Sequence, residues 1–453
     1  MAASESLNQG AGFHRAFFSS HKFNLQAIEL DGPAATKPPG SHTVTNAPPA
    51  TATPTPQPLA GVRVVDVGNF LAGPYAASIM GEFGADVIKV EHPIGGDPMR
   101  RFGTATERPD ATLAWLSESR NKRSVTIDLL QSEGVQLFLK LIAKSDVLVE
   151  NFRPGTMESW GLTWDALRKA NPKLVMLRVT GYGQTGPYRR RHGFAHIAQA
   201  FAGLNYLAGY PGETPVLPGT VPLGDYIASL FGAIGVLVAL RHAEATGRGQ
   251  VVDVGIYEAV FRVLEELAAV YGLHGKVRER EGSGSFVACP HGHFRTKNDK
   301  WMAIACTTDK MFERLAVAMG RPELASAEIW GEQRKRLAAR DEVNRVVSEW
   351  VASMDRPEVL EKCLAEEVPA GKVNSIADIF ADEHFHARGN LARVPAGELG
   401  EVVVPGVVPT LSATPGRINH LGPTLGNATT DVLQGLLGLH ADELQRLRLN
   451  KTI

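Results

Sequence analysis

The sequence predicts an α/β protein built on an open, doubly wound parallel β-sheet. β-branched runs alternate with helical patterns from Leu59 onward, and the first strand, helix and strand fit within about thirty residues, the spacing of a βαβ unit. The chain has 453 residues, of which 44% are hydrophobic and 21% charged, as in a soluble globular protein. Ligands of such sheets bind outside the carboxyl ends of the strands, so the residues that follow each strand are the candidate site residues.

The elements of the predicted sheet follow one another in a regular order. Strands are expected at residues 62–67, 85–91, 123–129, 146–151 and 174–180, with helices at 74–83, 132–144 and 163–171 between them. Pro74 suits the first position of its helix because the fixed φ of proline matches helical geometry there. From residue 194 to 240 the pattern is helical, apart from a Gly- and Pro-containing loop at 209–215.

The rest of the chain predicts a smaller domain and then a return to the first one. Short strands near Phe294 and at 301–305, followed by helices from 309 to 354, indicate an α+β domain. After Gly389 come strand-like runs at 401–404 and 407–408 and a last helix at 431–447. The expected boundaries are a leader at 1–58, the large domain at 59–282 and 389–453, and the small domain at 283–388.

The leader differs in composition from everything after it. Eight prolines lie between Pro33 and Pro58 among Thr, Ala and Ser, which predicts a disordered segment with too few apolar side chains to form a core. The Ser-rich segment from His14 to Lys22 resembles an organellar transit peptide, whereas the nearby acidic residues favour an uncleaved tail. A mitochondrial and a cytoplasmic location therefore both stay open.

Charge and cysteine usage limit the classes of partner. The 47 Lys and Arg residues balance 48 Asp and Glu residues, and this net charge of -1 gives no basic excess for nucleic acid or an anionic membrane. Cys289, Cys306 and Cys363 have no Cys-x-x-Cys spacing, which argues against a disulfide framework or a cysteine zinc site. The longest apolar run, from Tyr226 to Leu240, is shorter than the about 18 to 20 residues that span a bilayer and predicts a buried helix.

The strand ends carry a glycine turn and several basic residues. Gly68 and Gly73 do not have the Gly-x-Gly-x-x-Gly spacing, so a dinucleotide-binding dehydrogenase is disfavoured, although the following helix could still bind a phosphate or thioester oxygen. Basic residues near other strand ends suit the phosphates of a nucleotide-bearing ligand, and a solvated surface is the alternative for each. They are Arg100, Arg101, Arg120, Lys122, Arg123 and Arg153.

Histidine and carboxylate positions give weaker signals. The pairs His291/His293 and His384/His386 lack a third ligand, so no metal site is expected. Asp225 lies where a Gly- and Pro-containing loop meets an apolar helix. It could cap that helix or act as a nucleophile towards an activated acyl group, and the local sequence leaves both interpretations open.

Six motifs together resemble the family III CoA-transferases, the group that includes formyl-CoA:oxalate CoA-transferase, carnitine CoA-transferase and α-methylacyl-CoA racemase. The resemblance runs from about Leu59 to the C-terminus. The motifs are Leu71-Ala72-Gly73-Pro74, the run from Phe83 to Glu91, Asn121-Lys122-Arg123-Ser124, the run from Asp146 to Gly155, the run from Thr180 to Pro187, and Thr246-Gly247-Arg248-Gly249-Gln250.

The resemblance implies a fold, an assembly and a reaction. The family forms interlocked homodimers, each chain having a Rossmann-like large domain made of its N- and C-terminal parts and an inserted small domain. The substrates are CoA thioesters and a carboxylic acid, with no permanently bound cofactor. By resemblance, Asp225 in Leu223-Gly224-Asp225 attacks the thioester to give an anhydride and then an aspartyl-CoA thioester. The positions expected to contact CoA are Leu71, Ala72, His92, Asn151, Phe152, Arg153 and His192.

Departures from the family pattern leave alternatives open. Leu71 and Ala195 replace residues of the oxalate enzyme, so another acceptor is expected, and the donor by analogy is a dicarboxylyl-CoA such as succinyl-CoA. Ala195 cannot carry a proton, which disfavours racemase chemistry, although His196 could replace it. The stretch 289–293 lacks the glycines of the family's mobile loop. A non-catalytic CoA-binding subunit of a heteromeric transferase is the third alternative.

Overall fold

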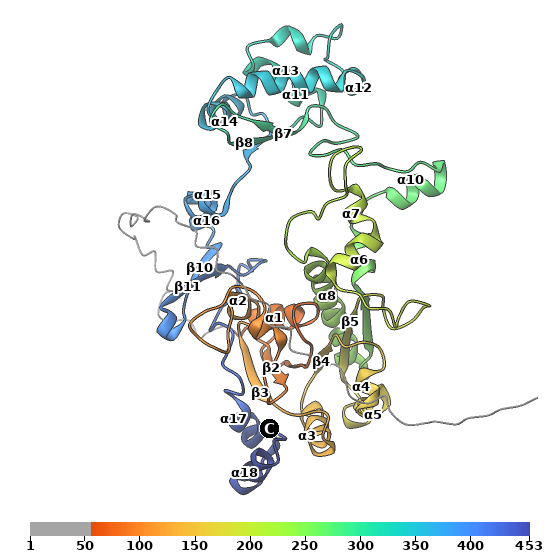
Figure 1. The fold of residues 1–453 in the computed structure, drawn as a ribbon, viewed down its shortest axis with the longest axis vertical. Coiled ribbons are helices and arrows are strands. Elements are labelled where there is room, and N and C mark those ends of the chain that lie inside the picture. The colour runs from red at the N-terminus through yellow and green to blue at the C-terminus, as the bar shows by residue number, and fades with distance from the viewer. Residues whose placement is uncertain (1–55) are drawn as a thin grey trace, which may run out of the picture. The chain divides into compact units, whose positions relative to one another are not determined.

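The computed structural model describes residues 56–453, so the predicted leader and transit peptide lie almost entirely outside the described residues. Six parallel strands form the main sheet in the order β3-β2-β1-β4-β5-β6 (Figure 1). They are β1 (Arg63–Asp66), β2 (Asp86–Glu91), β3 (Lys122–Thr126), β4 (Val147–Glu150), β5 (Val175–Thr180) and β6 (Val251–Gly255). The predicted parallel sheet is confirmed, and its strand order reverses between β1 and β4, where ligands of such sheets bind.

Both faces of this sheet are covered by helices. Successive strand residues point to opposite faces. Val65 and Leu148 share a core with α3 (Ser132–Ile142) and α5 (Trp164–Ala170), whereas Val64 and Val147 share the other core with α1 (Pro74–Glu82) and α8 (Leu223–Thr246). Burial on both faces explains why these strands read as continuous hydrophobic runs. The shorter α2 (Leu113–Glu118), α4 (Thr156–Ser159) and the 3-10 helix Pro98–Arg101 fill the connections.

The C-terminal segment returns to the main sheet. The backbone N–H of Thr126 in β3 donates to Thr429 Oγ1 at 3.0 Å, and the N–H of Ser124 donates to Asn427 Oδ1 at 3.0 Å. The predicted single helix 431–447 is wrong, because the chain forms α17 (Thr429–Leu437) and α18 (Ala441–Leu449). Gly438 between them has φ 69°, a left-handed conformation that ends a helix.

The predicted helical region and the chain that follows it up to His274 contain five helices. They are α6 (Ala195–Ala202), α7 (Leu204–Leu207) and α8, followed after β6 by α9 (Ile256–Arg262) and α10 (Leu267–His274). The sequence analysis missed β6, an edge strand whose short run is interrupted by the exposed Asp253.

The apolar run 226–240, expected to form a buried helix, lies within the helix α8, which is buried on one side only. α8 is 24 residues long, and by length and composition it would also suit a membrane span. One side, with Ala228 and Val236, packs in the sheet core, whereas Ile234 and Val238 are 57% and 66% exposed.

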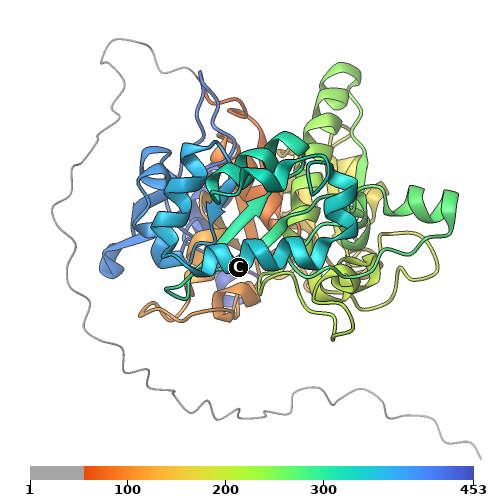
Figure 2. The same cartoon turned by 90° about the horizontal axis from the view of Figure 1, so that it is seen from above.

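Two further sheets are antiparallel. β7 (His291–Arg295), β8 (Trp301–Ala305) and β9 (Ala370–Lys372) pack with α11 (Asp309–Ala318), α12 (Gln333–Ala338), α13 (Arg340–Ala352) and α14 (Arg356–Ala365), which Figure 2 shows grouped together. β10 (Leu391–Pro395) and β11 (Glu401–Pro405) form a hairpin beside α15 (Ile376–Phe380) and α16 (Glu383–Ala387). The remaining 3-10 helices are Pro322–Ala325 and Gly397–Leu399.

Two sequence expectations for these regions differ in outcome. The strand expected at 407–408 does not form, because the ladder ends at Pro405, which has no N–H to donate. The expected domain boundaries at 282/283 and 388/389 stay predictions.

A cluster of buried charges lies at the carboxyl edge of the main sheet. Asp66, the last residue of β1, accepts a hydrogen bond from Lys122 Nζ at 2.9 Å and lies 3.4 Å from Lys89 Nζ. Lys89 Nζ also lies 2.9 Å from Asp97 Oδ2. All four side chains are buried. Burial alone would lower the pKa of Lys89, but the charges of Asp66 and Asp97 outweigh this effect and raise it.

Removing Asp66 from this cluster should destabilise the protein strongly. Asp66→Asn removes the carboxylate that faces both Lys89 and Lys122, so only Asp97 remains to neutralise two buried ammonium groups. We therefore expect the free energy of unfolding in urea to fall by about 3–5 kcal/mol. The control is Asp165→Asn, which removes an exposed ion pair with Arg168 and should cost less than about 1 kcal/mol. Equal losses for the two variants would contradict a stabilising role of the cluster.

Candidate active site

The loop that follows β1 is held in place from three sides. The Asn151 amide, just after β4, donates to Asn69 O and Ala72 O, both at 2.6 Å, and accepts from Asn69 N at 2.8 Å. Gly73 N donates to Ser229 Oγ of α8 at 3.1 Å. A Cβ at Gly68 would lie 3.0 Å from Asn151 Oδ1, so the close approach requires glycine there. The loop is therefore a rigid part of the sheet edge.

The buried charge cluster supplies the third attachment. Asp97 Oδ1 accepts from Phe70 N at 3.0 Å and from Met99 N at 2.9 Å, while its other oxygen faces Lys89. Phe70 has φ 57°, which is uncommon for a residue other than glycine and requires such support from its surroundings. The cluster thereby sets the direction of the Phe70 and Leu71 side chains.

Asp225 is the third residue of α8 and does not cap it. The N-cap is Pro222, and Asp225 uses its own backbone N–H to bond Pro222 O at 2.9 Å. Within residues 56–453, Asp225 Oδ1 is buried and has no hydrogen-bond partner. Burial raises the pKa of Asp225 to about 7. The interpretation of Asp225 as a helix cap is therefore wrong, and the carboxylate is left uncommitted for chemistry.

A cavity of about 500 Å³ surrounds this carboxylate, and we call it the Asp225 pocket. Its size is in the range of small-molecule sites. Most of its lining is apolar, and no Arg or Lys of the described chain contributes to it. The lining residues are Phe70, Leu71, Met99, Phe102, Phe194, Ala195, His196, Gln199, Leu217, Thr220, Val221, Pro222 and Asp225.

A second cavity of about 260 Å³ lies where the strand order of the sheet reverses, and we call it the switch-point pocket. Its lining includes Asn69, His92, Phe152 and Trp160. The rings of Phe152 and Trp160 pack edge to face, with their centroids 5.0 Å apart. Asn69 and Phe70 are consecutive residues, yet they line the switch-point pocket and the Asp225 pocket, respectively. The two cavities therefore flank the same loop.

The structure brings only some of the predicted CoA-contacting residues together. Leu71 lies in the Asp225 pocket, His92 and Phe152 lie in the switch-point pocket, and Ala72 is buried in the loop between them. The Asn151 side chain bonds the loop itself, so it would shape the site through the loop.

The two remaining predicted residues lie on the surface. Arg153 is exposed beside the switch-point residue Phe152, and His192 is exposed in the segment before α6.

Three of the basic residues that suited phosphates, Arg100, Arg120 and Lys122, instead pair with buried carboxylates. Arg100 is buried and bonds Glu91 at 2.6 and 2.7 Å, and Arg120 is buried and bonds Glu82 at 2.7 Å. These arginines are neither phosphate ligands nor solvated surface residues, because their charges neutralise carboxylates from other elements. Lys122 serves Asp66 in the same way.

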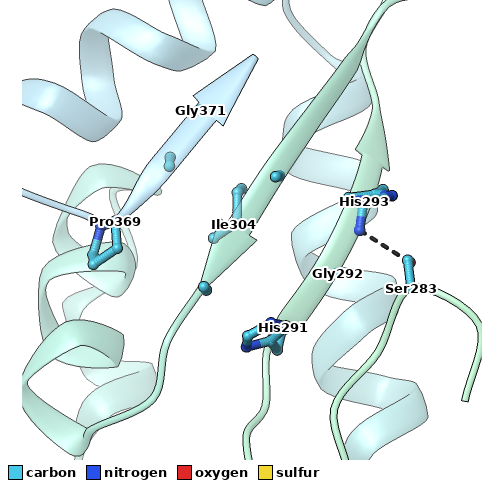
Figure 3. A pocket seen from close by; sticks show the side chains of 10 residues that line it. Ser283, His291, Gly292, His293, Ile304, Pro369 and Gly371 are labelled. Carbon is cyan, nitrogen blue, oxygen red and sulfur yellow. Dashed lines mark hydrogen bonds between the residues drawn. The ribbon is translucent and has the colours of Figure 1, made fainter. Parts of the chain in front are cut away.

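A third hollow of about 410 Å³ lies on the β7–β9 sheet (Figure 3). Ser283 Oγ accepts from His293 N at 3.1 Å there, and the figure also labels the lining residues His291, Gly292, Ile304, Pro369 and Gly371. No carboxylate lines this hollow, and residues 56–453 contain no group of three potential metal ligands. Residues 291–293 of the stretch 289–293 belong to β7, and burial raises the pKa of its one thiol, Cys289, to about 11, which disfavours the reactive thiolate.

Sequence reasoning missed two residues that shape the Asp225 pocket. Asp97 gave no signal, because its partners Phe70 and Lys89 are brought together only by the fold. Gln199 did leave a signal, since it stands four residues after Ala195 and shares a helix face with it.

Comparisons with known proteins agree with the motifs. The family model for CoA-transferase family III matches residues 59–429. The alpha subunit of succinyl-CoA--L-malate CoA-transferase from Chloroflexus aurantiacus is 70% identical over 94% of this chain and 99% of that protein. The beta subunit from the same species is 58% identical over 88% of this chain and 99% of its own.

Solved structures show the same fold. A CAIB/BAIF family protein from Brucella suis aligns with a TM-score of 0.76 and 31% identity over 84% of this chain and 100% of its own. A protein from Mycobacterium tuberculosis aligns with a TM-score of 0.73 and 30% identity over 84% of this chain and 99% of its own.

The raised pKa of Asp225 predicts a pH-dependent cost to stability. The folded-state pKa of about 7 lies above the unfolded value of about 3.9, so the carboxyl group costs the protein stability as pH rises between these values. We therefore expect Asp225→Asn to raise the melting temperature by more at about pH 8 than at about pH 5. Calorimetry at both pH values measures this, with the exposed Asp165→Asn as control. If the difference in melting temperature between Asp225→Asn and the unchanged protein did not increase from pH 5 to pH 8, the raised pKa of Asp225 would be contradicted.

Proposed function

The chain belongs to CoA-transferase family III, and from that premise we propose that it moves CoA from succinyl-CoA to L-malate or a similar hydroxydicarboxylic acid, with Asp225 as nucleophile. The observation that carries the proposal is the uncommitted Asp225 carboxylate in an apolar pocket of about 500 Å³. The substrates follow the names of the succinyl-CoA--L-malate CoA-transferase subunits and of the D-citramalate enzyme, which is 40% identical to this chain.

The reaction proceeds through intermediates bound to Asp225. The carboxylate attacks the thioester carbonyl of succinyl-CoA. The C–S bond breaks, CoA departs as its thiolate, and a succinyl-aspartyl anhydride remains on the enzyme. The thiolate then attacks the Asp225 carbonyl, which releases succinate and forms an aspartyl-CoA thioester. The malate carboxylate then attacks the aspartyl-CoA thioester, which releases CoA thiolate and forms a malyl-aspartyl anhydride. The thiolate attacks the malyl carbonyl of this anhydride, which releases malyl-CoA and restores the Asp225 carboxylate. Covalent catalysis of this kind divides one difficult exchange into easier steps.

The surroundings of Asp225 suit these intermediates. An anhydride is readily hydrolysed, and an apolar lining limits the access of water to it. The switch-point pocket, with aromatic rings at the ends of parallel strands, suits the nucleotide part of CoA. Because Asn69 and Phe70 line the two pockets in turn, the pantetheine arm would pass over the loop between them.

Trapping the intermediate tests the role of Asp225. With succinyl-CoA present, borohydride should reduce the Asp225 thioester and hydroxylamine should convert Asp225 to a hydroxamate, both detectable by peptide mass spectrometry. Asp225→Ala should lose at least about 10³-fold in transferase kcat because the nucleophile is gone. Asp165→Asn, far from the pocket on α5, should keep full activity. Full activity of Asp225→Ala would refute the proposed mechanism.

Proton exchange at the α-carbon is a second candidate, because His196 lines the same pocket as Asp225. An imidazole there could serve as the base that Ala195 cannot be. Incubating an α-methylacyl-CoA in deuterated water without any acceptor acid separates the two reactions. Deuterium incorporation lost in His196→Ala would favour the racemase, whereas a thioester product formed only with added acid favours the transferase.

We further propose that a second family III chain covers the outer side of α8. Leu230, Ile234, Leu237 and Val238 are 44–66% exposed and lie on one helical face, and α10 has no buried residue. The burial of such an apolar stripe would favour association. The relatives named as alpha and beta subunits supply both a second copy and a homologous chain as partners, so the homodimer and the heteromer are both open.

Sedimentation velocity distinguishes these assemblies. The chain should sediment above its monomer mass of 48.8 kDa, either alone or after a homologous subunit is added. Ile234→Asp should shift it towards the monomer, because a carboxylate would be buried in an apolar interface. Lys169→Glu, an exposed change on α5, should have no effect. A monomer under both conditions would contradict the interface.

A further inference from the structure

Gln199 of α6 is a buried amide with one uncommitted end. Its side chain is 1% exposed, and its Oε1 accepts a hydrogen bond from Gly224 N at 3.1 Å. Nε2 is buried and has no hydrogen-bond partner among the described residues. A buried amide donor left unpaired costs free energy, so native proteins rarely keep one without a use. A ligand in the adjoining cavity is a natural acceptor for it.

The direction of this amide follows from its partner. A backbone N–H can only donate, so Gly224 must face the oxygen of Gln199 and Nε2 must point elsewhere. Gly224 also permits the contact, because a Cβ there would lie 3.2 Å from Gln199 Cγ. Gly224 directly precedes Asp225. The amide is therefore anchored on the residue next to the nucleophile.

The Asp225 pocket holds few other groups that could stabilise negative charge. His196 and Thr220 also line it, but both side chains are exposed, and no Arg or Lys of residues 56–453 contributes. Asp225 and Gln199 both line this pocket, and each has one buried atom without a hydrogen-bond partner among residues 56–453, the acceptor Asp225 Oδ1 and the donor Gln199 Nε2. They do not bond each other, so both remain available to a substrate placed between them.

We propose that Gln199 Nε2 donates a hydrogen bond to the acyl oxygen of the carbonyl at which the Asp225 intermediates form and break. This inference rests on the proposed function of Asp225. When a nucleophile adds to that carbonyl, the π electron pair moves to oxygen, and the Gln199 N–H stabilises the oxyanion without giving up its proton. The pair returns when the thiolate or carboxylate leaves. A preorganised donor of this kind, in a site that excludes water, stabilises the transition state more than the ground state.

Two substitutions separate this role from a structural one. Gln199→Glu keeps an oxygen for Gly224 N–H but replaces the donor with an anion, and Gln199→Met removes both. We expect each to lower kcat by about 10²–10³-fold, with little change in KM. Because a second carboxylate would raise the pKa of Asp225, kcat is compared on the alkaline plateau of each variant. The matched control is Gln434→Glu on the exposed surface of α17, which should leave kcat unchanged.

The kcat, KM and melting temperature of the Gln199 variants decide whether Gln199 has the proposed role. A lower kcat for Gln199→Glu with an unchanged melting temperature, and slower formation of the trapped Asp225 adduct, supports it. Gln199→Glu activity within about threefold of the unchanged protein overturns it, as does a loss that appears only in KM or only with a lower melting temperature. Asp225→Ala in the same assay tests the premise separately. If that variant is inactive while Gln199→Glu is normal, only the inference about Gln199 fails, whereas an active Asp225→Ala refutes the nucleophile itself.

Discussion

The buried charge cluster of Asp66, Lys89, Asp97 and Lys122 is the constraint on which the site depends. Four charged side chains can be held out of water only when each faces an opposite charge, so the end of β1, the middle of β2 and the start of β3 must stay in register. Asp97 then transmits this register to Phe70 through a backbone hydrogen bond. The cost of desolvating the charges is offset by their mutual attraction, and the cluster holds the backbone of the loop at Phe70.

That loop separates two cavities with different chemistry. On one side are aromatic rings and strand ends suited to a nucleotide, and on the other is an apolar pocket around one carboxylate. A CoA thioester needs both environments, because its nucleotide part carries charged phosphates whereas its reacting carbonyl must be protected from water. Burial in this pocket also raises the pKa of Asp225 to about 7, so the charged form of this carboxyl group lowers the stability of the fold at neutral pH.

The helix α8 carries both Asp225 and the exposed apolar side that we propose as an interface. Its first turn carries Gly224 and Asp225, its inner side packs on the sheet, and its outer side exposes Ile234 and Val238. Small residues on the inner side allow the close approach, since a Cβ at Gly232 would lie 3.0 Å from Leu177. A partner on the outer side would therefore contact the same helix that carries Asp225.

The parallel sheet, the position of most of its helices and the family were all predictable from the order of the residues alone. Strand runs such as 85–91 and helix starts such as Pro74 reflect local burial and backbone geometry, which a short window of residues records. The family motifs also singled out Asp225, although the local sequence allowed it to be a helix cap. Only the tertiary structure decided that Pro222 is the cap, that Arg100 and Arg120 neutralise buried carboxylates, and that α8 is buried on one side alone. The physical reason is that these outcomes depend on partners distant in the chain: Arg120 meets Glu82 across 38 residues, and Gln199 meets Gly224 across 25. Such pairings follow from how the layers pack, and no local pattern of residues encodes them.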